Sequence, residues 1–210
     1  SHDACDGEPR DEQTDEINQP CFDDFRRAIC QVGHDFVMLS DHGESFDRSD
    51  YPDVLLHRAD RGDELVSRNG GPVASWAGCE AGVSPPEGAA AVLVLAGNES
   101  AMMPVGIEGH VADSEAEREA VYGSATTDSV AVLRAQGAVV LAQHTEDWSE
   151  AELADLGFDG FEMYNLHANT VMGAGAAIGL IADLKTPEEL PYPDLVVLPI
   201  FNEDKRYLER

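Results

Sequence analysis

The sequence predicts an α/β fold with parallel strands, and three observations support this prediction. Short apolar segments of strand length alternate with segments of helical periodicity along the 210 residues. A helix predicted over residues 22–32 carries apolar side chains at helical spacing and stops at Gly33, a residue suited to a C-terminal cap. An apolar strand over residues 36–39 follows at once and leads into Ser40-Asp41-His42.

The remaining elements follow in chain order. A polar segment over residues 43–71 includes a predicted helix near 51–61, and strands follow over 73–80 and 90–96. A helix over 128–136 is closed by Gly137 and precedes a strand over 138–142. Ser149 and Glu152 have the spacing of a capping box that opens the next helix. Further elements are predicted over 160–164 (strand), 174–184 (helix) and 195–200 (strand), and without repeats or linkers the chain, 1–210, is predicted to be one domain.

The charge of the chain restricts the partners that it can have. Its 13 basic and 41 acidic residues give a net charge of −28, which repels nucleic acid and anionic membrane surfaces. No apolar stretch is long enough to predict membrane insertion. The acidity fits either a soluble acidic surface in a GC-rich genome or adaptation to high salt, and we favour the second.

Four cysteines lie at positions 5, 21, 30 and 79, without a C-x-x-C pair that would indicate a zinc ribbon or a redox motif. Cys30 falls on the apolar face of a predicted helix and Cys79 in a predicted strand, so both are predicted to be small buried residues. Cys5 and Cys21 could pair in an oxidising compartment, but the pattern does not demand it. The sequence leaves the compartment open.

Histidines and one carboxylate recur where apolar strands end. His42 and His144 follow predicted strands, His110 follows the apolar segment 102–107, and Glu80 ends the strand over 73–80. The carboxyl ends of parallel strands meet at one face, where binding sites are built. Imidazole and carboxylate ligands suit zinc, iron or manganese, so this pattern predicts a metal site.

Other readings of the chemistry are weaker. A lone histidine is more often an ordinary polar residue than a ligand, and this reading is preferred for His34 and His57. His167 is left undecided. The chain has no G-x-S-x-G elbow, Walker loop or Rossmann fingerprint, and Gly173-Ala174-Gly175 lacks the lysine of a phosphate loop.

An ordered set of motifs resembles the polymerase and histidinol phosphatase (PHP) superfamily. Residues 33–42, which end in Asp41-His42, are similar to its second motif of glycine, strand and Asp-His. In the family's order follow Gly78-Cys79-Glu80, Gly109-His110-Val111, the strand ending at His144, and Gly160-Phe161-Glu162-Met163-Tyr164-Asn165. His2, in Ser1-His2-Asp3, resembles the end of the family's opening His-x-His motif.

The resemblance implies a distorted β/α barrel that hydrolyses a small-molecule phosphate ester with a metal-activated water. It implies that His2, His42, Glu80, His110 and His144 are metal ligands and that Asp41, Glu162 and Asn165 assist catalysis or shape the site. The implied cofactors are divalent ions of zinc, manganese or iron, two or three in the full-length protein. The first histidine of the opening pair and the closing Asp-x-His motif are absent, so the barrel is expected to be incomplete at both ends.

Two other functions remain open. An amidohydrolase-like enzyme would use a similar metal site to cleave a carbon–nitrogen bond. It usually has a carboxylated lysine at a strand end, whereas Lys185 and Lys205 lie near helices. A degenerate, non-catalytic metal-binding domain is the third possibility.

Overall fold

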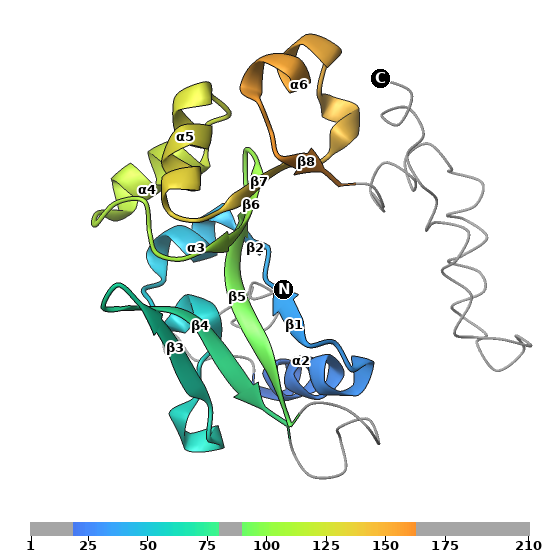
Figure 1. Ribbon diagram of the computed structural model, residues 1–210, viewed down its shortest axis with the longest axis vertical. Coiled ribbons are helices and arrows are strands. Elements are labelled where there is room, and N and C mark those ends of the chain that lie inside the picture. The colour runs from blue at the N-terminus through green and yellow to red at the C-terminus, as the bar shows by residue number, and fades with distance from the viewer. Residues whose placement is uncertain (1–18, 80–89, 163–210) are drawn as a thin grey trace, which may run out of the picture. The chain divides into compact units, whose positions relative to one another are not determined.

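The computed structural model describes residues 19–79 and 90–162, which form a mixed α/β structure (Figure 1). The chain divides into two compact units, residues 1–140 and 141–210, and each is described by itself. The first unit contains α2 (Gln19–Val32), β1 (Phe36–Met38), β2 (Asp41–His42), α3 (Gly43–Arg48), β3 (Glu64–Arg68), β4 (Gly71–Gly78), β5 (Ala91–Glu99), β6 (Met103–Ile107), α4 (Glu115–Tyr122) and α5 (Thr127–Ala135).

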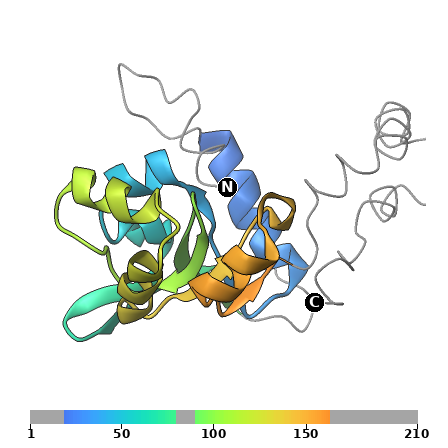
Figure 2. The same cartoon turned by 90° about the horizontal axis from the view of Figure 1, so that it is seen from above.

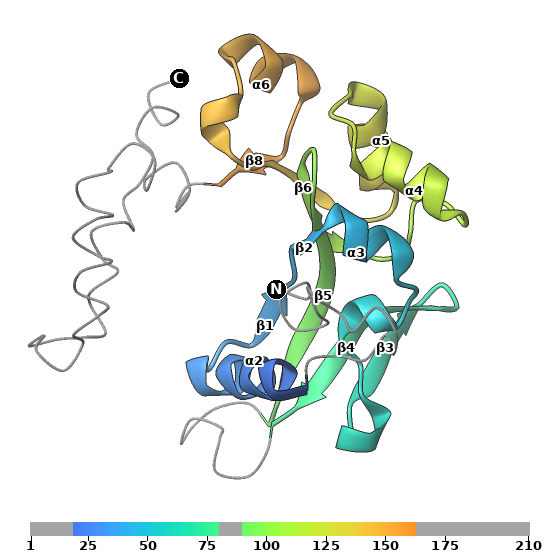
Figure 3. The same ribbon diagram turned by 180° about the vertical axis from the view of Figure 1, so that it is seen from behind.

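Strand β5 is the centre of the first unit. Its first half pairs in parallel with β1 and antiparallel with β4, and its second half pairs in parallel with β2 and antiparallel with β6. Strand β3 extends the sheet beyond β4, in the open order β3-β4-β5-β6. Figures 1 and 3 show α2 beside the start of β5 and α3 beside its end. The α/β class is therefore confirmed, but the described strands form an open sheet and not a closed barrel.

The predicted parallel arrangement holds for β1 and β2 beside β5 but is wrong for the pairs β3–β4, β4–β5 and β5–β6, which are antiparallel. Asn69 and Gly70 both have positive φ values (54° and 89°), the conformation of a two-residue hairpin turn, so β3 and β4 run antiparallel. Next to the antiparallel ladder of β4 and β5, the backbone N–H of Cys79 also donates to the Ala90 carbonyl (2.9 Å). The backbone N–H of Ser100 donates to the Met102 carbonyl (3.1 Å), which makes the turn from β5 to β6 too short for a crossover.

Helix α2 buries its apolar face against this sheet. Figure 2 shows it to one side of β5. Phe22 and Ile29 of α2 pack with Val92 and Val94 of β5 and with neighbouring apolar residues. Helix α2 ends at Gly33, whose φ of 74° is the left-handed conformation predicted for its cap. Burial of this face, and not helix propensity, supplies most of the stability of such a helix.

Cys30 is buried as predicted, but the prediction that Cys30 and Cys79 serve only as small buried residues is wrong. Cys30 of α2 and Cys79, just after β4, form a disulfide bond, 49 residues apart in sequence. Cys21 is disulfide-bonded as well. The local sequence pattern does not indicate this bond, because it does not show that Cys30 of α2 lies beside the end of β4.

The segment between α3 and β3 also differs from its prediction. Instead of a helix near 51–61, it contains two 3₁₀ turns, Asp53–Leu55 and Ala59–Arg61. Leu56 and Gly62 take left-handed conformations at the ends of these turns, which prevents one continuous helix. Helix α4 was not predicted from the sequence, although Ser114 caps it by accepting a hydrogen bond from the Glu117 backbone N–H.

The boundary between the units falls within β7 (Val139–Ala142), and the described part of the second unit continues with a 3₁₀ turn (Thr145–Asp147), α6 (Glu150–Leu156) and β8 (Gly160–Phe161). Strands β7 and β8 are parallel, as predicted, with Ala142 opposite Phe161. The predicted capping box at Ser149 and Glu152 is confirmed, and Gly157 ends α6 in the left-handed conformation. The predicted elements over 174–184 and 195–200 lie outside the described residues.

Candidate functional site

The structure describes five of the eight residues singled out from the sequence. Asp41, His42 and His110 belong to the first unit, and His144 and Glu162 belong to the second. The remaining three, His2, Glu80 and Asn165, lie outside the described residues.

Asp41 and His42 lie where they were predicted, at the carboxyl end of a parallel strand. They form β2 and pair in register with Asn98 and Glu99, the last two residues of β5. Asp41 is buried, whereas His42 is exposed and precedes the first turn of α3 without a side-chain capping bond. Figure 1 shows β2 between β1 and α3, beside the end of β5 with which it pairs.

Asn98 is a polar residue at this strand end that sequence reasoning missed. Its side chain is fully buried, and neither its amide nitrogen nor its oxygen has a hydrogen-bond partner among the described residues. As the register partner of Asp41, it faces the same side of the sheet. A buried carboxamide without partners costs about 1–3 kcal/mol and calls for an explanation, which a bound cation or oxyanion would provide.

A signal for Asn98 existed in the sequence. Asn98-Glu99 follows an apolar strand in the way that Asp41-His42 does, but the strand was predicted to end at residue 96. Two glycines allow the chain segments to approach closely here, because neither has a Cβ atom. A Cβ atom on Gly97 would lie 2.1 Å from the Leu39 carbonyl oxygen, and one on Gly43 would lie 2.9 Å from Ser100 Oγ.

His110 lies in an aromatic cluster and not at an open strand end. Its Nε2 donates to the Ser49 carbonyl (2.6 Å), and its Nδ1 lies 3.3 Å from the Tyr122 hydroxyl. Phe46, Tyr51 and Tyr122 pack edge-on around the imidazole. Burial lowers the pKa of His110, against the opposing effect of the Ser49 carbonyl, so the ring is neutral at neutral pH. Both ring nitrogens are engaged, so His110 does not fit the role of a metal ligand in this arrangement.

The strand order also changes the argument for Glu80. Strand β4 runs antiparallel to β5, so its last residue, Gly78, pairs with Ala91 at the start of β5. The residues of β2 pair with the other end of β5. The carboxyl ends of β2 and β4 therefore lie at opposite ends of β5. This removes the reason for which Glu80 was predicted to join His42.

In the second unit, His144 and Glu162 follow strands that run parallel, as predicted. Glu162 directly follows β8, and its backbone N–H donates to the carbonyl of Ala142, the last residue of β7 (3.0 Å). His144 lies two residues beyond β7 and has a positive φ of 45°, a conformation that non-glycine residues adopt at some cost. Trp148 Nε1 donates to the Gln143 carbonyl (2.7 Å), which holds the turn after His144. His144 and Glu162 thus follow the ends of adjacent parallel strands.

These residues only partly fit a metal site. Within residues 19–79 and 90–162, no three His, Cys, Asp or Glu side chains come close enough together to hold a metal ion. The orphaned amide of Asn98 beside Asp41 favours a ligand at the end of β5, whereas the bonds of His110 oppose its participation. We therefore derive no catalytic step through a metal.

Comparisons with known proteins give no further constraint. No family model matches the chain, and neither a curated protein nor a solved structure matches it. None of the helices in the described part of the chain is both long and apolar enough to cross a membrane.

Proposed function

We propose that this chain is part of a metal-dependent phosphoesterase of the PHP type that hydrolyses a small-molecule phosphate ester. The observation that carries the proposal is the position of Asp41-His42, at the carboxyl end of a strand parallel to β5 and beside the orphaned amide of Asn98. His144 and Glu162, which follow a second pair of parallel strands, support it further. The motif order along the sequence connects these positions to a phosphoesterase.

In this proposal each residue has a limited role. His42 and His144 are the described histidines that would bind metal, and Asp41 would orient His42 from its buried position. Glu162 would act as an acid–base assistant. Bound divalent ions of zinc, manganese or iron would neutralise the phosphate and lower the pKa of a water molecule. The described strands would form part of the distorted β/α barrel of the PHP type.

The proposal is tested on the natural protein that contains this chain. Its metal content is measured by plasma mass spectrometry, and p-nitrophenyl phosphate turnover is measured with manganese, with and without a chelator. We expect bound metal, chelator-sensitive turnover, and a loss of at least about 100-fold for His42→Ala and His144→Ala. His34→Ala is the matched control, since His34 is exposed and not proposed as a ligand. Metal-free protein, or turnover that the chelator leaves unchanged, would contradict the proposal.

A second candidate is a degenerate, non-catalytic domain, and the bonding of His110 favours it. A predicted ligand whose two nitrogens are satisfied by Ser49 and Tyr122 is typical of a structural histidine. This candidate predicts no turnover of any phosphate ester and an unchanged metal content in His110→Gln. The phosphoesterase proposal, as stated above, does not depend on His110, so the activity measurement separates the two.

An amidohydrolase-like activity is distinguished by its substrate. Metal-dependent, chelator-sensitive cleavage of an amide such as a p-nitroanilide, without phosphoesterase turnover, would favour that reading. The lysines that it could use, Lys185 and Lys205, lie outside the described residues.

A further inference from the structure

Positive charge gathers at one place in this acidic chain. Three arginines, Arg26, Arg58 and Arg61, surround the ring of Phe22, with guanidinium carbons 6.0, 4.8 and 5.4 Å from its centroid. Phe22 is buried, so the ring holds these groups near one another. Three of the 13 basic residues thus lie against one aromatic ring, although the chain has a net charge of −28. Guanidinium groups gathered on one ring offer several hydrogen-bond donors to an anion.

Arg26 is the fixed member of this arginine cluster, by which we mean Arg26, Arg58 and Arg61. Its two terminal nitrogens each bond one oxygen of Asp63 at 2.6 Å, and one of them also donates to the Gly78 carbonyl (3.2 Å). Both side chains of this pair are almost completely buried. Arg26 therefore has a structural role at this cavity, and a ligand is not expected to displace Asp63 from it.

Arg61 is held much more loosely. Its partner is Asp23, and the two side chains are 28% and 46% exposed. Ion pairs of this exposure are worth little, so a ligand can compete with Asp23. The hydrogen bond from Arg61 lowers the pKa of Asp23, which keeps the competing carboxylate charged at neutral pH. The guanidinium group of Arg58 donates to the His57 carbonyl (3.1 Å) and has no carboxylate partner within the described ranges.

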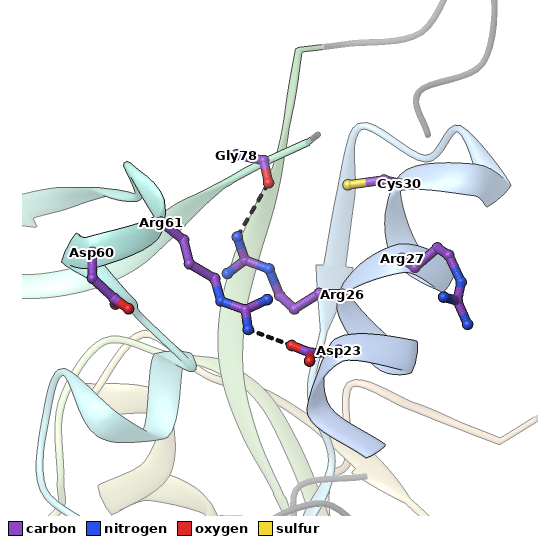
Figure 4. Close-up of a pocket in the computed structure, with 7 residues that line it drawn as sticks. All are labelled: Asp23, Arg26, Arg27, Cys30, Asp60, Arg61 and Gly78. Carbon is purple, nitrogen blue, oxygen red and sulfur yellow. Dashed lines mark hydrogen bonds and ion pairs between the residues drawn. The ribbon is translucent and has the colours of Figure 1, made fainter. Parts of the chain in front are cut away.

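A cavity of about 470 Å³ lies at two members of this cluster, Arg26 and Arg61, and Asp23, Asp60 and Gly78 line it as well. Figure 4 shows the Arg26 and Arg61 guanidinium groups close together between α2 and the chain around Asp60, while Arg27 extends away from them. The volume is in the range of small-molecule sites. Guanidinium groups bind phosphate and carboxylate through paired hydrogen bonds, which makes these anions the best match.

This cavity is separate from the strand end that carries Asp41 and His42. Gly78 pairs with Ala91 at the start of β5, and Asp41 pairs with Asn98, seven residues further along that strand. At the rise of a β-strand, this separation is roughly 23 Å. A ligand in the cavity would therefore not reach the candidate catalytic residues of the first unit.

We propose that the cavity at the arginine cluster is a binding site for a small molecule that carries a phosphate or carboxylate group, and that the ligand displaces Asp23 from Arg61. Arg26 and the Phe22 ring hold the site in place, and Arg61 supplies the exchangeable contact. The proposal makes no use of a metal and is independent of the phosphoesterase activity.

The test is calorimetric titration of the protein with inorganic phosphate and, separately, with succinate. A chelator is present throughout, and chloride at equal ionic strength is the control titrant. The two anions distinguish a phosphate site from a carboxylate site. We expect Arg61→Gln to weaken binding by about tenfold or more, since it removes a charge-assisted hydrogen bond to the anion. Asp23→Asn should instead tighten binding several-fold, because it removes the competing carboxylate.

The two variants should change anion affinity in opposite directions, and this distinguishes a binding site from a structural ion pair. If the pair only stabilised the fold, both variants would lower the melting temperature and neither would change anion affinity. Arg68→Gln is the matched control, since Arg68 is an exposed arginine that pairs with Glu108 away from the cluster. The proposal is overturned if neither anion binds, if Asp23→Asn weakens binding, or if Arg68→Gln reduces affinity as much as Arg61→Gln.

Discussion

At the scale of single residues, Arg26 and Asp63 show how a buried charge is satisfied in this protein. Asp63 accepts bonds from Arg26 and from the backbone N–H groups of Arg58 and Gly78 (2.9 and 3.0 Å). Burial alone would raise the pKa of Asp63, but these bonds outweigh it and the pKa is lowered. Since the folded pKa lies below the unfolded value, this stabilisation is present above about pH 4 and is lost as the pH falls further.

We expect Asp63→Asn to destabilise the protein by about 3 kcal/mol, because it leaves the Arg26 charge buried without its carboxylate. Urea denaturation at neutral pH measures the change. Asp24→Asn is the control, since Asp24 pairs with Arg27 on the surface and should cost less than about 0.5 kcal/mol. Equal losses in the two variants would show that burial of the pair is unimportant.

Asp47 has the opposite electrostatic environment. Burial, followed by the nearby charges of Glu119 and Glu115, raises its pKa to about 6, and its Oδ1 has no hydrogen-bond partner among the described residues. A raised folded pKa means that the folded protein binds this proton more tightly than the unfolded chain does. The contribution of Asp47 to stability is therefore complete below about pH 4 and is lost as the pH rises through about 6.

The Asp47→Asn variant should lose this pH dependence. We compare the free energy of unfolding of this variant with that of the unchanged protein. As the pH rises from about 4 to about 8, we expect the difference to shift in favour of the variant by up to about 3 kcal/mol. Urea denaturation at both pH values measures the difference, with Asp155→Asn, an exposed aspartate on α6, as the control. A constant difference between Asp47→Asn and the unchanged protein at the two pH values would refute the role of Asp47.

At the scale of elements, the close approach of β5 to the chain between β1 and β2 positions the strand-end residues. Gly97 makes this approach possible, because any Cβ atom there would overlap the Leu39 carbonyl at 2.1 Å. The backbone N–H of Leu39 also donates to the Leu95 carbonyl (2.9 Å), so the strands cannot separate without losing a ladder bond.

Gly97→Ala is therefore expected to destabilise the protein by about 3 kcal/mol or more, since backbone and not a flexible side chain must move. Gly71→Ala is a matched control in β4, where an added Cβ atom meets nothing within 4 Å, and it should change stability by less than about 0.5 kcal/mol. Thermal or urea unfolding of both variants tests this. A mild effect of Gly97→Ala would mean that β5 and β2 are not packed as closely as described.

At the scale of the whole molecule, the Cys30–Cys79 disulfide joins α2 to the end of β4 and closes a loop of 49 residues. Disulfides persist in oxidising compartments, so this bond favours a location outside a reducing cytosol. A loop of this length restricts the unfolded chain strongly, and the chain-entropy relation assigns it about 4 kcal/mol.

We expect the double variant Cys30→Ala, Cys79→Ala to lose about 4 kcal/mol of stability in urea denaturation. A reductant should then destabilise the unchanged protein more than the double variant, because only the former contains this bond. Equal sensitivity of the two proteins to reductant would show that this disulfide does not contribute.

Much of the fold was predictable because its signals are local. The α2 cap at Gly33, the capping box at Ser149 and the parallel pair β7–β8 were all predicted, since each depends on residues a few positions apart or on one strand–helix–strand step. The Asn69-Gly70 hairpin also had a local signal, which was missed because the surrounding segment was read as polar loop. The predicted strand ends at Asp41-His42 and His144 were placed correctly for the same local reason.

The sequence by itself determined the α/β class, the acidic surface and the strand-end positions of Asp41, His42 and His144. Only the tertiary structure decided that β4 runs antiparallel to β5, that Cys30 meets Cys79, and that His110 is held by Ser49 and Tyr122. These contacts join residues 12 to 61 positions apart, and they depend on which surfaces pack together. Periodicity reports which face of an element is apolar, but it does not report which partner covers that face.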